Sequence, residues 1–276
     1  YEICACLVGS EMCIRDRVAG VATATVISRI INLVIVVLLG AVLVKAKQHP
    51  ERESNREVMG QIIRIGLPSA CETAIYNVSM TLVIRFLNQM DAQGLNVTAR
   101  SYTMQITNFS YCVGAALAQA NAIMTGWHIG AKEYDACDRG TRKAAIIGVI
   151  VAVILETMFA LCSGWIMQLF SKDPQMVSLV GKLLAIDIVL EMGRVTNLVY
   201  GQALKTSGDA VFPVVMGACF MILCSVGGTY LFGIRLGLLA VGAYIGMAGD
   251  ECVRAVGMYL RWKSGKWKEK GLVKSR

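Results

Sequence analysis

Three carboxylates stand inside long, largely apolar stretches of the sequence, where a charged side chain is expensive. Glu72 follows Pro68 by four residues, and Asp187 and Glu191 lie four residues apart in a later stretch. An ionised carboxylate inside a membrane is costly unless it is paired or hydrated, and such residues mark the paths of ions and protons. We therefore predict that Glu72, Asp187 and Glu191 are acceptors for a proton or a sodium ion.

A structural role is the alternative for each carboxylate. Glu72 can instead pair with a basic residue of a neighbouring helix. Arg194 follows Glu191 by three residues and shares its helix face, so these two side chains are expected to pair. Asp187 then remains as a titratable group, unless it lies near one membrane face, where its charge costs less.

Polar and aromatic side chains at helical spacing accompany these carboxylates and predict the wall of a cavity. Rings and amides suit amphipathic, often cationic, small molecules. The alternative, for the small residues that follow them in one stretch, is close packing between helices. Pro68 removes one backbone hydrogen bond and predicts a helix kink. The predicted lining residues are Tyr76, Asn77, Tyr102, Gln105, Asn108, Phe109, Arg194 and Asn197.

The elements that must hold these side chains are apolar helices long enough to cross a bilayer. Val18–Val44 contains one charged residue, Ala144–Phe170 contains only Glu156, and Ala210–Ile234 contains none. A hydrocarbon core of ~30 Å needs about 20 such residues in a helix. The sequence therefore predicts an all-α integral membrane protein, with the lipid bilayer as its surroundings. Seven spans are expected, at residues 18–46, 58–90, 96–128, 142–171, 175–206, 208–234 and 236–262.

Residues 1–17 do not fit this pattern of spans. They lack an initiator Met, and they lack the basic start and long apolar run of a signal peptide. We interpret them as a non-native leader that resembles translated adapter sequence.

The basic residues predict the orientation of the spans. Residues 261–276 carry seven Lys and Arg against one acid, which accounts for most of the net charge of +8. Such a tail beside a membrane faces anionic lipid rather than nucleic acid. Basic loops lie on the cytoplasmic side, so the loop at 47–57 and the tail at 263–276 are expected in the cytoplasm of a cell whose cytoplasmic membrane holds the protein. The first span then enters from outside, as expected if an odd number of spans precedes it.

Metal and enzyme chemistry find little support in the sequence. The ten cysteines form no CxxC pair, and only two histidines are present. No HExxH motif or comparable catalytic cluster occurs, so we expect no metal site, no resident cofactor and no enzyme.

Several short motifs, in order and at matching spacing, resemble the multidrug and toxic compound extrusion (MATE) family from Val18 to the C-terminus. The motifs are Ile65-Gly-Leu-Pro-Ser-Ala-Cys-Glu72, Ala118-Gln-Ala-Asn121, Glu191-Met-Gly-Arg194, Gly208-Asp209 to Pro213, and Asp250-Glu-Cys-Val-Arg254.

The resemblance implies a fold and a function. MATE proteins have twelve spans in two lobes and export cationic and amphipathic compounds in exchange for Na⁺ or H⁺. By this resemblance, residues 18–46 are the sixth span, residues 58–262 are the C-terminal six-span lobe, and an N-terminal lobe of the same protein is the missing partner. It also places Glu72 and either Asp187 or Glu191 at one cation site.

Two other functions remain open. A lipid-linked oligosaccharide flippase of the same superfamily would need a cavity rich in Arg and Lys, whereas Arg194 is the only basic residue expected in this cavity. A membrane-embedded enzyme is the alternative from a different class.

Overall fold

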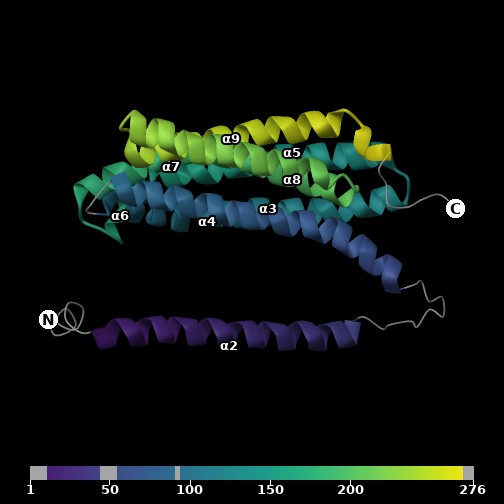
Figure 1. Ribbon diagram of the computed structural model, residues 1–276, viewed down its shortest axis with the longest axis horizontal. Coiled ribbons are helices and arrows are strands. Elements are labelled where there is room, and N and C mark those ends of the chain that lie inside the picture. The colour runs from purple at the N-terminus through teal and green to yellow at the C-terminus, as the bar shows by residue number, and fades with distance from the viewer. Residues whose placement is uncertain (1–10, 44–54, 91–93, 270–276) are drawn as a thin grey trace. The chain divides into compact units, whose positions relative to one another are not determined.

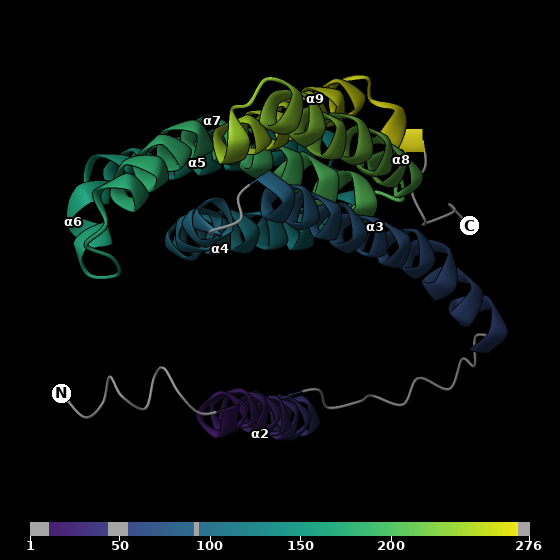
Figure 2. The ribbon, with the colours of Figure 1, turned by 60° about the vertical axis from the view of Figure 1, so that its left-hand side comes forward.

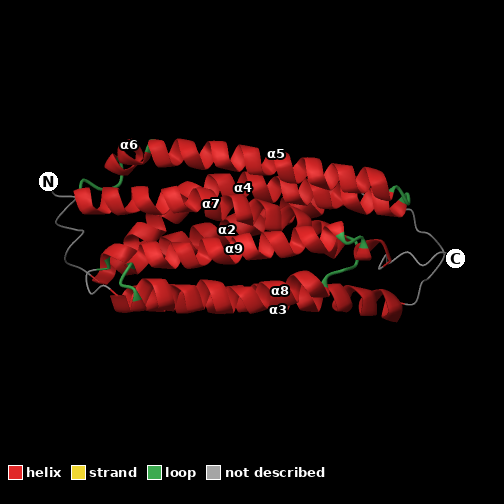
Figure 3. Cartoon of the chain, turned by 90° about the horizontal axis from the view of Figure 1, so that it is seen from above, coloured by secondary structure: helices red, strands yellow, loops and turns green. Residues whose placement is uncertain are grey.

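The computed structural model describes residues 11–43, 55–90 and 94–269, and within these ranges it contains helices and no strand (Figure 3). The chain divides into two units, Tyr1–Asn55 and Arg56–Arg276. The element of the first unit is α2, Glu11–Leu43. It begins inside the predicted leader, so Glu11–Arg17 continue the helix of the first span.

The second unit contains the remaining helices, which are labelled in Figure 1. Their bounds are α3 Asn55–Met90, α4 Leu95–Gly130, α5 Tyr134–Leu161, α6 Ser163–Gln168, α7 Pro174–Thr206, α8 Val211–Phe220, η1 Met221–Val226, η2 Thr229–Arg235, α9 Leu239–Lys263 and η3 Lys266–Glu269.

Each predicted span corresponds to a helical stretch, with two notable differences. The fourth helix, α5, begins at Tyr134, eight residues before the predicted start, because a membrane helix continues into its polar flank while hydropathy detects only the apolar part. It also ends at Leu161, and the short helix α6 follows. Residues 47–54 of the predicted loop and 270–276 of the predicted tail lie outside the described residues.

The sixth stretch contains a feature that the sequence does not signal. After α8, the backbone continues as two π-helical segments, η1 and η2, up to Arg235. Wide turns of this kind are rare and occur often at functional sites. Gly228 lies between them and faces Gly246 of α9, where an added Cβ on Gly228 would come within 2.7 Å of the Gly246 Cα.

Pro68 does not interrupt its helix. The helix α3 is continuous from Asn55 to Met90, and Figures 1 and 2 show its first part curving away from the line of its second part.

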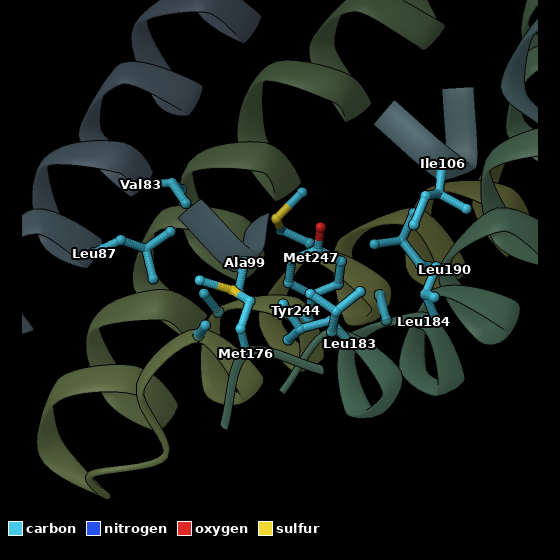
Figure 4. Close-up of a cluster of buried hydrophobic side chains, with 14 of the residues drawn as sticks. Val83, Leu87, Ala99, Ile106, Met176, Leu183, Leu184, Leu190, Tyr244 and Met247 are labelled. Carbon is cyan, nitrogen blue, oxygen red and sulfur yellow. The ribbon is translucent and has the colours of Figure 1, made fainter. Parts of the chain in front are cut away.

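Helix α7 is the central helix of the second unit and packs against α4, α5 and α9 (Figure 2). One apolar cluster surrounds its first half, where Leu183, Leu184 and Leu190 meet Tyr244 and Met247 of α9 (Figure 4). A second cluster surrounds its last turns, where Val199 and Leu204 pack with Trp262 and Trp267. These two clusters fix the register of α7 against its neighbours.

The outer faces of the helices are apolar, as expected for contact with lipid. On α5, the exposed side chains include Ile146, Ile147, Ile150 and Ile154. Among the described residues, Tyr134–Leu161 and Val211–Arg235 are long and apolar enough to cross a membrane by length and composition, and Val26–Gly40 is a shorter apolar helix.

A glycine sets the distance between α7 and α9. An added Cβ on Gly193 would lie 2.9 Å from the backbone nitrogen of Cys252. The two backbones therefore approach closely at the point where Glu191 and Arg194 of α7 face Glu251 of α9.

Replacing Gly193 by Ala should lower the free energy of unfolding by about 1–3 kcal/mol, because the new methyl group collides with rigid backbone. Unfolding of the purified protein in detergent measures the change. Gly140→Ala is the control, since an added Cβ there meets nothing within 4 Å, and Ala favours helix by about 0.5–1 kcal/mol. Equal stability of the two variants would contradict the close approach.

Candidate functional site

A cavity of about 560 Å³ opens between α3, α4, α7, α8, η1 and α9. Its wall combines charged groups with aromatic and sulfur-containing side chains. The charged lining residues are Glu72, Asp187, Glu251, Arg100, Arg194, Lys205 and Arg254, and the large uncharged ones include Tyr76, Tyr111, Tyr244, Met104, Met221, Met247 and Met258. A concave site with apolar walls and a few charges suits small amphipathic molecules.

Glu72 is paired at one end of this cavity. The Nζ atom of Lys205, in the last turn of α7, lies 2.6 Å from Oε2 of Glu72, and each side chain is about one fifth exposed. Gly217 of α8 brings its backbone against the same carboxylate, since an added Cβ there would lie 3.4 Å from Oε1. The structural alternative for Glu72, an ion pair with a neighbouring helix, is the arrangement that the structure contains.

Arg194 joins α7 to α9 through two carboxylates. Its Nη1 donates to Glu191 Oε2 at 2.8 Å, which confirms the predicted pair, and its Nε lies 3.6 Å from Glu251 Oε1. Asn197 also donates to Glu251, at 3.1 Å. The guanidinium lies over the ring of Tyr111, 5.8 Å from its centre.

Arg254 continues this network along α9. It donates to Asp250 at 3.0 Å and approaches Glu251 to 2.8 Å, and Ser225 of η1 donates to the same Asp250 oxygen at 3.1 Å. These residues lie in the middle of α9, and Glu251 and Arg254 reach the cavity.

Asp187 differs from the other cavity carboxylates. Its residue is 3 % exposed, and its Oδ2 atom has no hydrogen-bond partner among the described residues. No basic side chain in the described part of the chain lies within ion-pair distance of it. Glu72 has one such partner and Glu251 has two, and Glu191, beside the wall, has one. Asp187 is therefore the unpaired acid of the cavity wall, as the sequence predicted once Arg194 was assigned to Glu191.

Glu72 and Asp187 both line the cavity. Lys205, which pairs with Glu72, is separated from Asp187 by 18 residues of the same helix, which is about 27 Å along the axis at ~1.5 Å per residue. The expectation of one cation site containing Glu72 together with Asp187 or Glu191 stays a prediction.

The predicted lining residues divide into two groups. Tyr76, Asn108, Arg194 and Asn197 line the cavity. Asn77, Tyr102, Gln105 and Phe109 do not, and this is a correction.

On α4, the prediction placed the cavity wall on the wrong face of the helix. The α4 side chains in the wall are Arg100, Met104, Thr107, Asn108 and Tyr111. At ~100° per residue, this stripe is rotated by about 120° from the predicted one. Phe109 is 70 % exposed, and Tyr102 packs against Phe170 with ring centres 5.6 Å apart.

Sequence reasoning also missed most of the basic residues of the cavity. Lys205 of α7 and Arg100 of α4 line the cavity, and neither is predicted from the sequence. Arg100 donates to Met80 Sδ at 3.6 Å rather than to a carboxylate. The available signal was a basic residue inside the predicted span, four residues after its start for Arg100 and one residue before its end for Lys205. Within the described residues, no group of three or more His, Cys, Asp or Glu side chains is arranged to hold a metal ion.

Comparisons with known proteins agree with this architecture. The MatE family model matches residues 68–231. The chain is 34 % identical over 258 residues to the uncharacterized transporter YisQ of Bacillus subtilis, which covers 93 % of this chain and 56 % of YisQ. It is 23 % identical over 267 residues to the probable multidrug resistance protein NorM of Thermotoga maritima, covering 93 % of this chain and 55 % of that protein.

A solved structure shares the fold. The eukaryotic MATE transporter AtDTX14 superposes with a TM-score of 0.75 at 16 % sequence identity, over 87 % of this chain and 54 % of that one. The helices and their cavity thus define an all-α membrane transporter fold. The chain belongs to the MATE family, and it spans about half the length of the curated relatives that it matches.

Arg254→Met should lower the free energy of unfolding by about 3–5 kcal/mol, because it leaves the buried Asp250 without its base and removes the shorter of the two ion pairs of Glu251. Arg139→Met, at an exposed position of α5, serves as the control and should change stability by less than about 0.5 kcal/mol. Thermal unfolding of both purified variants compares them. A small loss for Arg254→Met would show that the network on α9 adds little to stability.

Proposed function

We propose that the full-length protein exports amphipathic cations across the cytoplasmic membrane in exchange for Na⁺ or H⁺, with an N-terminal lobe of the same protein completing the cavity. The observation that carries this proposal is Asp187, a buried carboxylate with an unpartnered oxygen in the wall of a cavity. Such a group can bind either a small cation or the positive charge of a substrate.

The chemistry of the cavity wall supports a cationic, partly apolar substrate. Tyr76, Tyr111 and Tyr244 offer aromatic faces, on which cations bind. Methionine side chains offer polarisable surface that adapts to different shapes. These features favour broad selectivity for amphipathic compounds rather than one tightly matched substrate.

The alternative of a lipid-linked oligosaccharide flippase is less well supported. Four basic side chains line the cavity, more than the sequence predicted, but three of them are held by carboxylates. Lys205 is paired with Glu72, Arg194 with Glu191, and Arg254 with Asp250 and Glu251. The wall therefore offers little uncommitted positive charge for a phosphate group.

Exchange follows if Asp187 is occupied by one positive charge at a time. A proton or Na⁺ at Asp187 removes its attraction for a cationic substrate, and a bound substrate disfavours the coupling ion. Coupling also requires that each ligand favours a different conformation of the protein, since a ligand that binds both equally shifts nothing. Glu72 and Glu191, already paired, serve as structural charges of the cavity in this scheme.

Asp187→Asn in the full-length protein should abolish ion-coupled efflux, because the amide carries no negative charge and takes up no proton. Everted vesicles with sodium and pH gradients imposed separately measure efflux and identify the coupling ion. Glu72→Gln is the matched comparison and should retain coupled efflux. Normal efflux by Asp187→Asn at equal expression would refute the role of Asp187, and loss only in Glu72→Gln would transfer that role to Glu72.

We further propose that the C-terminus is cytoplasmic. Two contacts bring the polar ends of several helices together: Arg261 donates to Asp209 at 2.6 Å, and Trp262 donates to Asp138 at 2.8 Å. The basic residues Arg139, Arg142 and Lys143 near the start of α5 therefore lie at the same end as the basic end of α9. Basic loops of this kind face the cytoplasm.

A C-terminal fusion tests this orientation. Green fluorescent protein fused after Arg276 should fluoresce in bacterial cells, and alkaline phosphatase fused there should be inactive, because each reporter matures on one side of the membrane. An active phosphatase would reverse the proposed orientation.

A further inference from the structure

Glu156 of α5 is a buried acid that the proposed exchange step does not use. It is 0 % exposed, and both of its carboxylate oxygens lack a hydrogen-bond partner among the described residues. It stands in a helix of 28 residues that is long and apolar enough to cross a membrane. An ionised carboxylate without a partner is very costly in such surroundings.

The packing of α4, α5 and α7 determines what surrounds Glu156. Val195 of α7 is wedged between two glycines: an added Cβ on Gly114 of α4 or on Gly148 of α5 would lie 2.7 Å from one of its methyl groups. The start of α5 packs with the end of α7, and its end packs with the start of α7, so these two helices are antiparallel. Helices α4 and α7 run in the same direction.

This register brings polar groups together in the seam between the three helices. Glu156 follows Gly148 by eight residues, and Asp187 precedes Val195 by eight, so the two acids lie at the same level. Glu191 precedes Val195 by one helical turn on α7, and Ser110 precedes Gly114 by one turn on α4. Ser110 is 1 % exposed, and its hydroxyl has no partner among the described residues.

The charged groups that act on Glu156 all come from α7. They are Asp187, Glu191 and Arg194, of which Arg194 is already bound to Glu191 and Glu251. Helix α4 contributes the uncharged Ser110, one turn from the level of the two acids, and α6 contains no charged residue. Within the described part of the chain, Glu156 therefore faces two further acids, and the one base that acts on it, Arg194, is already bound to carboxylates.

We infer that Glu156 is a proton-binding site, separate from the cavity and reached from it through Asp187. The seam is closed by glycine and alanine contacts, and neither Glu156 nor Ser110 lines the cavity. A sodium ion needs several oxygen ligands at its surface, whereas a proton needs only the carboxylate itself and a neighbouring acceptor. Ser110 provides that neighbour, and Asp187 has one face in the seam and one in the cavity.

The inference deepens the proposed exchange, on which its transport role rests, by assigning a second place for the coupling proton. While a cationic substrate is bound at Asp187, Glu156 holds the one proton of the pair. When the substrate leaves, a second proton arrives from the cavity and binds Asp187, so that both acids are protonated. When the next substrate binds, Asp187 returns one proton to the cavity, so each cycle exchanges one proton for one substrate.

Infrared spectroscopy tests the proton on Glu156 without requiring transport. The full-length wild type at neutral pH should show the carbonyl stretch of a protonated carboxylic acid, which shifts in D₂O, and Glu156→Gln should lack one such band. Asp135→Asn is the control, since Asp135 is exposed in the first turn of the same helix and its loss should leave the band unchanged. A band that persists in Glu156→Gln would overturn the inference.

A second variant keeps the test decisive if Glu156→Gln does not fold. Ser110→Ala retains the carboxyl group but removes its neighbour, and should shift the frequency of the same band; an unshifted band would overturn the inference. Addition of Na⁺ at constant pH should leave the band in place. If the band disappears, Glu156 binds sodium rather than a proton, and the inference is overturned.

The same variants separate this inference from the proposed function. Tetraphenylphosphonium efflux by everted vesicles reports on exchange. If wild type shows no ion-coupled efflux but Glu156→Gln lacks the carbonyl band, the exchanger proposal fails and the proton site stands. If wild type exchanges while Glu156→Gln keeps the band, the proton site fails and the exchanger proposal stands.

Discussion

The cost of holding charge in an apolar helical bundle is the constraint on which the rest of this structure depends. Helix α7 carries Asp187, Glu191 and Arg194 on one face, and α9 carries Asp250, Glu251 and Arg254 opposite. Neither face could meet lipid. The charged faces of the two helices are paired through Arg194 and Glu251. The close backbone approach at Gly193 permits that contact. The charged network therefore acts as the joint between the two helices.

This joint also explains the chemistry of the cavity. Three of its basic side chains are paired with carboxylates. The four acids on or beside its wall that these bases neutralise are Glu72, Glu191, Asp250 and Glu251. Asp187 is left as the acid without a base in the described part of the chain. Glu72, which is the more conspicuous carboxylate in the sequence, is neutralised by Lys205. Lys205 lies about five helical turns from Asp187 along α7. The acid without a base therefore lies in the first half of α7.

The site was only partly predictable from sequence, and the reason differs between residues. Glu191 and Arg194 are three residues apart on one helix, so local geometry sufficed to pair them. Lys205 and Glu72 are far apart in the chain, and their contact depends on how α3 packs against α7, which no local pattern encodes. On α4, the polar stripe predicted from the sequence is rotated from the face that lines the cavity. Polar residues on another face of the same helix give the same pattern in sequence, so the pattern does not identify the cavity face.

The sequence by itself determined that the chain is an all-α membrane protein and where its spans lie, because hydrophobic length and turn residues act locally. It also marked the acids whose burial demands an explanation. Only the tertiary structure decided which of them are neutralised, since the partner of a buried charge is supplied by another helix. For the same reason it alone revealed that Glu156, isolated in its own span, faces two acids of α7.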